Sequence, residues 1–160
     1  MRILFVCTGN ICRSPMAAAL MKRRLAERGR TDIEVVSAGT AAADGAPASE
    51  GAYLIGLEKG LDISDHAATF LTREVVERAD LIFAMGTHHV GRAEALGGDG
   101  RTFLLGEYAG RGFTEAEVED PYGGSLDDYR HTYQQLDALL TDALDRLLRE
   151  DDAHAGPGDD

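Results

Sequence analysis

Residues 6 to 15 read VCTGNICRSP and place a cysteine and an arginine in a short loop after the apolar run ILFV. Five residues separate Cys7 from Arg13, and Ser14 follows directly. Successive backbone N–H groups in such a loop can surround a tetrahedral oxyanion, and an arginine adds a bidentate fork. The same positive environment stabilises a cysteine thiolate, which is a nucleophile. The spacing therefore predicts an oxyanion cradle with an activated Cys7.

The residues inside the loop suit this chemistry. The backbone N–H groups from Thr8 to Arg13 are the expected oxyanion donors. Gly9 allows the backbone to approach a ligand closely, and Asn10 tolerates a left-handed conformation that most residues resist. Ser14 can donate its hydroxyl to the cysteine sulfur and stabilise it as a leaving group, and with Pro15 it is also the expected helix start.

A thiolate that attacks phosphorus requires a proton donor for the leaving oxygen, and such a donor contributes about 10²–10⁴-fold to the rate. The best candidate is Asp120, in the stretch EDPYGGS at residues 119–125. Tyr122 beside it can line a pocket. Asp-Pro and Gly-Gly also favour turns, so a purely structural role for this segment stays open.

Other interpretations of the loop find less support. A cysteine that ends a buried strand is often an inert packing residue. The C-x4-C spacing of Cys7 and Cys12 matches neither a thioredoxin site nor a zinc knuckle, and the adjacent His88 and His89 diverge on a helix. Neither nucleotide-binding glycine pattern is present. We expect no metal and no cofactor.

The composition sets the class of protein. The 160 residues include 16 basic and 28 acidic ones, and the net charge of −12 argues against nucleic acid as a partner. Two cysteines exclude a disulfide scaffold and favour a cytoplasmic location. No apolar run suits a signal peptide or a membrane span. We expect one domain at residues 1–150, a disordered acidic tail at 151–160, and a monomer or weak dimer.

Short apolar runs alternate with helical segments, which is typical of an α/β fold with a parallel sheet. The pattern predicts a small doubly wound sheet of four strands, with helices on its faces and the cysteine loop after the first strand. The ligand is expected at the carboxyl ends of the strands. The predicted strands are residues 2–7, 33–39, 80–85 and 101–105, and the predicted helices include 47–58, a short one capped by Thr72, 86–98, and a long amphipathic one after Ser125 and Asp128.

Several segments resemble the low-molecular-weight protein tyrosine phosphatases. They are VCTGNICRSPMA at 6–17, SAGT at 37–40, GLDISDHAATFLT at 60–72, ADLIFAM at 79–85 and DPYGGSLDDY at 120–129. The resemblance implies that Cys7 is the nucleophile of a cysteinyl-phosphate and that Arg13 binds the phosphate and the transition state. It implies that Asp120 protonates the leaving group and then activates the hydrolytic water.

The same resemblance implies roles for further residues. Asn10, Ser14 and His66 would form the hydrogen-bond network that holds the loop. Cys12 would form a reversible disulfide with Cys7 on oxidation, which protects the nucleophile from irreversible damage. The partner implied is a phosphorylated protein, and no metal is required.

The residue at position 11 indicates which phosphorylated side chain the protein hydrolyses. The sequence resembles a bacterial branch of the family that contains protein arginine phosphatases. The similarity lies at three positions: Thr69, Gly86, and Gly123, which follows Tyr122. That branch carries threonine at the position of Ile11, whereas isoleucine is typical of tyrosine phosphatases. An apolar branched side chain favours an aromatic ring and offers a guanidinium no hydrogen bond. We therefore predict a phosphotyrosine phosphatase, with arginine phosphatase as the alternative.

Two more remote functions are possible for this loop. The related arsenate reductases share the fold and the loop, but they need a further cysteine pair, and this chain has no cysteine beyond Cys12. A silent oxyanion-binding module would be expected to lack the nucleophile or the acid, and both Cys7 and Asp120 are present.

Overall fold

A four-stranded parallel sheet forms the centre of the computed structural model, which describes residues 1–154. The strands are β1 (Arg2–Cys7), β2 (Glu34–Gly39), β3 (Leu81–Ala84) and β4 (Thr102–Leu104), in the order β2-β1-β3-β4. This confirms the predicted doubly wound α/β fold. The chain leaves β1 toward β2 on one side and later returns to β3 on the other, so the switch in strand order lies beside the carboxyl end of β1.

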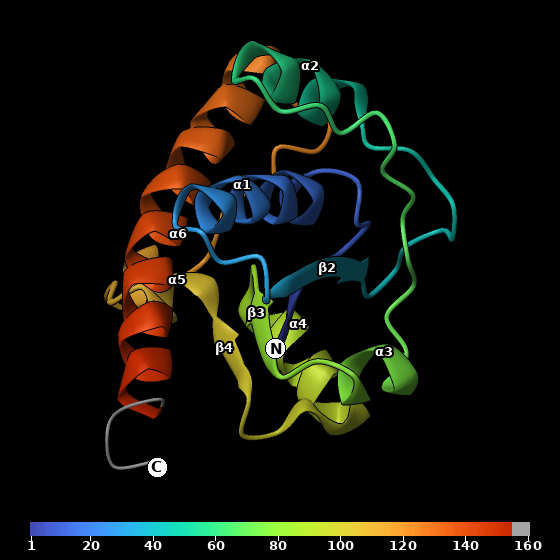
Figure 1. Ribbon diagram of the computed structural model, residues 1–160. Coiled ribbons are helices and arrows are strands. Elements are labelled where there is room, and N and C mark those ends of the chain that lie inside the picture. Colours follow the sequence, from blue (N-terminus) through green and yellow to red (C-terminus); the bar gives the residue numbers. More distant parts are fainter. Residues whose placement is uncertain (155–160) are drawn as a thin grey trace.

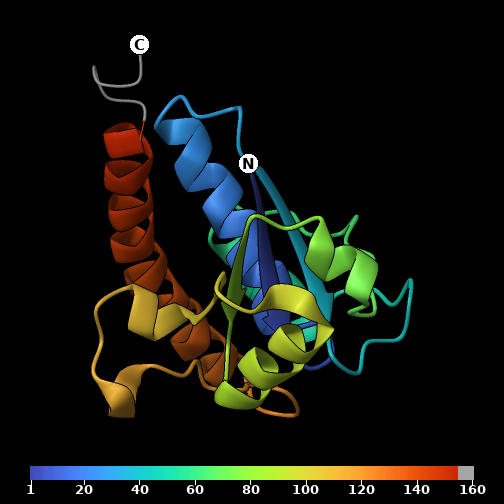
Figure 2. The same ribbon diagram turned by 90° about the horizontal axis from the view of Figure 1, so that it is seen from below.

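Helices cover both faces of the sheet (Figure 1). The helices on one face include α1 (Arg13–Glu27), α2 (Glu50–Glu58), α5 (Leu105–Tyr108) and α6 (Leu126–His154), and those on the other are α3 (Arg73–Glu77) and α4 (Thr87–Ala93). A π-helical turn, Glu94–Gly98, extends α4, and a 3-10 turn, Phe113–Glu115, follows α5. Figure 2 shows α1 and α6 side by side on their shared face.

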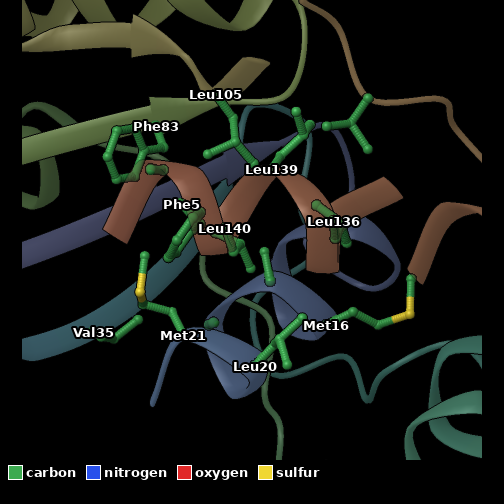
Figure 3. Packing of buried hydrophobic residues seen from close by; sticks show 14 of the residues in the cluster. Phe5, Met16, Leu20, Met21, Val35, Phe83, Leu105, Leu136, Leu139 and Leu140 are labelled. Atoms are coloured by element: carbon green, nitrogen blue, oxygen red, sulfur yellow. The ribbon is translucent and has the colours of Figure 1, made fainter. Parts of the chain in front are cut away.

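The hydrophobic core is divided by the sheet, as the alternation of side chains along a strand requires. Ile3 and Phe5 point toward α1 and α6, whereas Leu4 and Val6 point toward α3 and α4. Phe5 packs against Phe83 of β3 with the two rings tilted and their centroids 5.6 Å apart. Figure 3 shows leucines and methionines from α1 and α6 in the same hydrophobic cluster as these two rings. The strand that ends in Cys7 is therefore buried on both faces.

Helix starts differ from the sequence prediction in two places. Ser14 was expected to cap α1, but α1 begins at Arg13 and Cys12 occupies the N-cap position without a side-chain cap. The prediction is wrong because the Ser14 hydroxyl is engaged inside the loop. The helix expected from residue 47 begins at Glu50, since the Ser49 hydroxyl accepts the N–H of Ala52 and caps it.

The last helix is opened by the predicted capping box. The Ser125 N–H donates to Asp128 Oδ2 at 2.9 Å, and the Asp128 N–H donates to Ser125 Oγ at 3.2 Å. Helix α6 continues through residues 151–154, at the start of the predicted acidic tail. Asp151 holds this end through an ion pair with Arg30 at 2.6 Å. The rest of the predicted tail, residues 155–160, lies outside the described residues. None of the described helices is long and apolar enough to cross a membrane.

Candidate active site

The loop between β1 and α1 is held from outside through its carbonyl groups. The Cys7 carbonyl accepts the Thr40 N–H at 3.0 Å, the Thr8 carbonyl accepts the Ala41 N–H at 2.9 Å, and the Ile11 carbonyl accepts the Ser49 N–H at 2.8 Å. Within residues 1–154, the N–H groups of residues 8–12 have no such backbone partner. A loop whose carbonyls are satisfied outside and whose donors are available inside is arranged to bind an anion.

Asn10 is the central support of the loop. It is fully buried and adopts the predicted left-handed conformation, with φ 55°. Its side-chain amide donates to Ser14 Oγ at 2.7 Å and to Ser37 Oγ at 2.9 Å, and its Oδ1 accepts the Thr69 N–H at 2.9 Å. The strain of the left-handed backbone is therefore supported by three side-chain contacts from three parts of the chain.

The Cys7 sulfur lies 2.9 Å from Ser14 Oγ. The Asn10 amide can only donate through its NH₂, so the Ser14 oxygen accepts from it and the hydroxyl hydrogen remains for the sulfur. This polarity matches a Cys7 thiolate, which accepts the hydrogen bond. Cys7 and Cys12 are both free, and both are buried.

His66 reaches the loop from the segment after α2. Its Nε2 lies 2.6 Å from the Asn10 carbonyl oxygen, so this nitrogen carries the proton and donates. Burial lowers the pKa of His66, an effect that the hydrogen bond to Asn10 opposes. The three residues expected to form a network, Asn10, Ser14 and His66, are thus directly connected.

The second strand contributes to the network from its carboxyl end. Ser37 bonds Asn10, and a Cβ added at Gly39 would lie 2.5 Å from the Thr8 carbonyl oxygen. Only glycine therefore permits this approach of β2 to the loop. The SAGT segment ends the predicted strand 33–39, and its position at the carboxyl end of a strand parallel to β1 was the signal that could have indicated a contact with the loop.

Arg13 is 5% exposed and spans the distance to the loop before α6. Its Nη1 donates to the Val118 carbonyl at 3.1 Å, and its Nη2 lies 3.5 Å from Asp120 Oδ2. The Asp120 side chain is 51% exposed, and its other oxygen accepts the Tyr122 N–H at 3.1 Å. The Asp-Pro segment forms the turn that its sequence favours. The same turn also brings the Asp120 carboxylate to Arg13.

A cavity of about 220 Å³ lies above the sulfur. It is lined by Cys7, Thr8, Gly9, Ile11, Cys12, Arg13, Asp120 and Tyr122. The structure therefore brings together, on one cavity, residues 7–13 and residues that are more than 100 positions later in the chain. Tyr122 stands at the rim with 71% of its surface exposed.

Cys12 lies in a buried polar contact beneath the cavity. Its sulfur is 3.2 Å from Ser49 Oγ and 3.3 Å from the Tyr129 hydroxyl. Burial raises the pKa of the Cys12 thiol, and the two hydrogen bonds partly offset this effect. Cys12 is accordingly held as a neutral thiol in the same loop as Cys7.

Sequence reasoning also missed a contact between the loop and α4. The Thr8 hydroxyl lies 2.8 Å from Nε2 of His89, which belongs to α4. His89 was considered only as a poor metal ligand, and no spacing in the chain connects it to a loop 81 residues earlier. Within residues 1–154, no group of three or more His, Cys, Asp or Glu side chains is arranged to hold a metal ion.

A parallel α/β sheet with a thiol-bearing loop at the carboxyl end of its first strand, and a carboxylate opposite, fits the phosphatase class that the sequence resembles. The model of the family described as "Low molecular weight phosphotyrosine protein phosphatase" matches residues 2–153. The chain belongs to this family, and it is a phosphatase of that fold.

Relatives within the family carry two different activities in their names. A protein-arginine-phosphatase of Bacillus subtilis is 39% identical over 152 residues, which are 94% of this chain and 99% of the relative. A low molecular weight protein-tyrosine-phosphatase, Etp, of Escherichia coli is 34% identical over 149 residues, 92% of this chain and 95% of the relative. Identity at this level does not separate the two substrates.

A solved structure of the arginine phosphatase YwlE superposes with a TM-score of 0.83 at 39% identity and covers 92% of this chain and 95% of its own. It is described as a C7S mutant with a phosphorylated active site serine. That protein can therefore carry a phosphoryl group on the residue that replaces its cysteine.

Proposed function

We propose that this protein hydrolyses phosphotyrosine in proteins through a cysteinyl-phosphate intermediate. In the first step the Cys7 thiolate attacks phosphorus and the bond from phosphorus to the tyrosine oxygen breaks. Asp120, as the carboxylic acid, gives its proton to the departing phenolate oxygen. Arg13 and the loop N–H groups stabilise the equatorial oxygens, where charge is carried in the transition state.

In the second step water attacks the phosphorus of the cysteinyl-phosphate, and the bond from sulfur to phosphorus breaks. Asp120 accepts the proton of this water and so returns to its acid form. The sulfur leaves as a thiolate, to which the Ser14 hydroxyl donates across 2.9 Å. The products are inorganic phosphate and the free enzyme, with no oxidant or metal consumed.

The choice of tyrosine rests on one observation, the apolar wall that Ile11 gives to the cavity. Tyr122 at the rim provides an aromatic surface for the ring of a phosphotyrosine. A phosphoarginine carries several N–H donors into the same space, and a buried donor without an acceptor costs about 1–3 kcal/mol. Ile11 has no acceptor to offer.

Arginine phosphatase is the second candidate. The observation in its favour is the name of the Bacillus subtilis relative, which covers nearly the whole chain. The Asp120 carboxylate could accept a hydrogen bond from the guanidinium of a phosphoarginine. The choice between the two substrates therefore depends on Ile11 and not on the catalytic residues.

The deciding experiment measures kcat/KM for matched phosphotyrosine and phosphoarginine peptides, with the natural protein and with Ile11→Thr. We expect the natural protein to prefer phosphotyrosine and Ile11→Thr to shift the ratio toward phosphoarginine. Val75→Thr, a similar change on α3 away from the cavity, serves as the control and should leave the ratio unchanged. A natural protein that prefers phosphoarginine would overturn the assignment.

We further propose that Cys12 protects the nucleophile. A peroxide oxidises Cys7 to a sulfenic acid, the Cys12 thiol attacks that sulfur, and water leaves as the disulfide forms. The buried contacts with Ser49 and Tyr129 support this role, since they hold the Cys12 sulfur beside the cavity. A cytoplasmic location, a monomer or weak dimer, and a single domain at residues 1–150 stay predictions.

A further inference from the structure

His89 of α4 forms two hydrogen bonds, one at each ring nitrogen, and one of them reaches the anion-binding loop. The Gly86 N–H lies 3.0 Å from Nδ1, and Nε2 lies 2.8 Å from Oγ1 of Thr8. The ring is fully buried. The catalytic steps described above make no use of this histidine or of the Thr8 hydroxyl.

The direction of both hydrogen bonds follows from the donor at Gly86. A backbone N–H can only donate, so Nδ1 must accept and therefore carries no proton. Burial, with smaller contributions from His88 and Arg13, lowers the pKa of His89 to about 3, so the ring is neutral at ordinary pH. A neutral imidazole without a proton on Nδ1 carries it on Nε2, and Nε2 donates to the Thr8 oxygen.

The hydrogen of the Thr8 hydroxyl is consequently left for another acceptor. One lone pair of this oxygen is occupied by His89, which fixes the oxygen and restricts the rotation of the hydroxyl. Thr8 lines the cavity together with the nucleophilic sulfur and Arg13. The acceptor that the proposed function brings into this cavity is a phosphoryl oxygen.

We propose that the Thr8 hydroxyl is a phosphate-binding group that donates to the transferred phosphoryl, and that His89 is the residue that positions it. The proposal rests on the phosphate chemistry proposed for the loop but not on the choice between tyrosine and arginine. It assigns to the side chain of Thr8 a role additional to that of its backbone N–H.

Two substitutions at one position separate the two hydrogen bonds of His89. In His89→Asn the side-chain oxygen can replace Nδ1 and still accept the Gly86 N–H, but no group reaches Thr8. In His89→Gln the terminal amide nitrogen approximates Nε2 and can still donate to Thr8. Thr8→Val removes the hydroxyl and keeps the branched shape.

We expect Thr8→Val to lower kcat/KM and to weaken vanadate inhibition by about 10- to 100-fold, the range for a hydrogen bond to a charged group. His89→Asn should show a large part of the same loss, and His89→Gln should recover most of it. In the double variant Thr8→Val/His89→Asn the second change should have little further effect, because its only route to the phosphate has been removed.

The measurements use phosphotyrosine and phosphoarginine peptides in parallel, so that a common loss on both is distinguished from a changed preference. His88→Asn, which removes the neighbouring exposed histidine of α4, is the control and should match the natural protein. Thermal unfolding at the assay pH checks each fold. If His89→Asn does not fold, vanadate affinity of Thr8→Val decides alone.

Two results would overturn the proposal. One is a Thr8→Val protein whose kcat/KM and vanadate affinity equal those of the natural protein. The other is an equal loss in folded His89→Asn and His89→Gln, which would show that the ring only packs α4 against the loop. Absence of phosphatase activity in the natural protein would instead refute the proposed function, and vanadate binding would still test Thr8.

Discussion

The buried, uncharged state of His89 makes the stability of this protein sensitive to acid in a defined window. The pKa of His89 is lowered to about 3 by burial, against an ordinary value of 6.5. Below about pH 6.5 the unfolded chain therefore binds a proton that the folded protein does not bind, and stability falls as the pH falls toward 3. Above about pH 6.5 the histidine is neutral in both states and imposes no cost.

The size of the effect follows from the width of this window. Each pH unit between the unfolded and the folded pKa changes the free energy of unfolding by about 1.4 kcal/mol. At about pH 5 the folded protein should therefore have lost about 2 kcal/mol through His89 alone. For a domain of this length that corresponds to a fall of about 4–8 °C in Tm.

The assay compares denaturant unfolding of the natural protein and His89→Gln at about pH 7.5 and about pH 5. Glutamine does not titrate, so the variant should lose less stability on acidification, by about 2 kcal/mol. His66, whose pKa burial also lowers, and all the carboxylates are common to both proteins and cancel. His88→Gln removes only a smaller contribution to the lowered pKa of His89, so this control should follow the natural protein closely. Equal losses in the natural protein and His89→Gln would refute the reasoning.

Three further results are expected of the catalytic residues. Cys7→Ser should abolish hydrolysis of an aryl phosphate yet leave phosphate binding largely intact by calorimetry; retained turnover would exclude the cysteinyl-phosphate. Asp120→Asn should slow substrates with poor leaving groups more than activated ones, since a proton donor contributes about 10²–10⁴-fold, and a uniform loss would argue against that role. Mild peroxide should inactivate the natural protein reversibly, whereas Cys12→Ser should recover less activity on treatment with a thiol; equal recovery would contradict the protective disulfide.

Local patterns predicted much of the fold. The continuous apolar run of β1 required burial on both faces, and the alternation of strands with helices required a parallel sheet. The capping box of Ser125 and Asp128 was predictable because both partners lie within one turn. The predicted cap at Ser14 was wrong because it also rested on a local pattern, a serine before a proline. The hydroxyl of Ser14 instead contacts Cys7 and Asn10, and these contacts depend on the tertiary structure.

The parts of the candidate site that depend on contacts between distant elements could not be predicted from the sequence. Cys7 and Arg13 share one loop, so their spacing already indicated the chemistry. The contact of His89 with Thr8 depends on how α4 lies against the end of β1, and the contact of Arg13 with the Val118 carbonyl depends on a backbone atom. Neither contact follows from residue types or spacing.

An anion site in a chain of net charge −12 requires that the negative charges stay away from one helix end. The first turns of α2, α3 and α6 carry acidic residues, such as Glu50, Glu74 and Asp127, which complement their dipoles. The first turn of α1 carries none and instead begins with Arg13. The positive end of α1 is therefore left without a side-chain carboxylate of its own, and in the proposed function the phosphate of the substrate supplies the negative charge. Asp120 is the carboxylate that approaches this end from another loop, where it pairs with Arg13 at 3.5 Å. In the proposed mechanism an arriving phosphate competes with Asp120 for that guanidinium, so Asp120 is released from Arg13 and, in its protonated form, can face the leaving group.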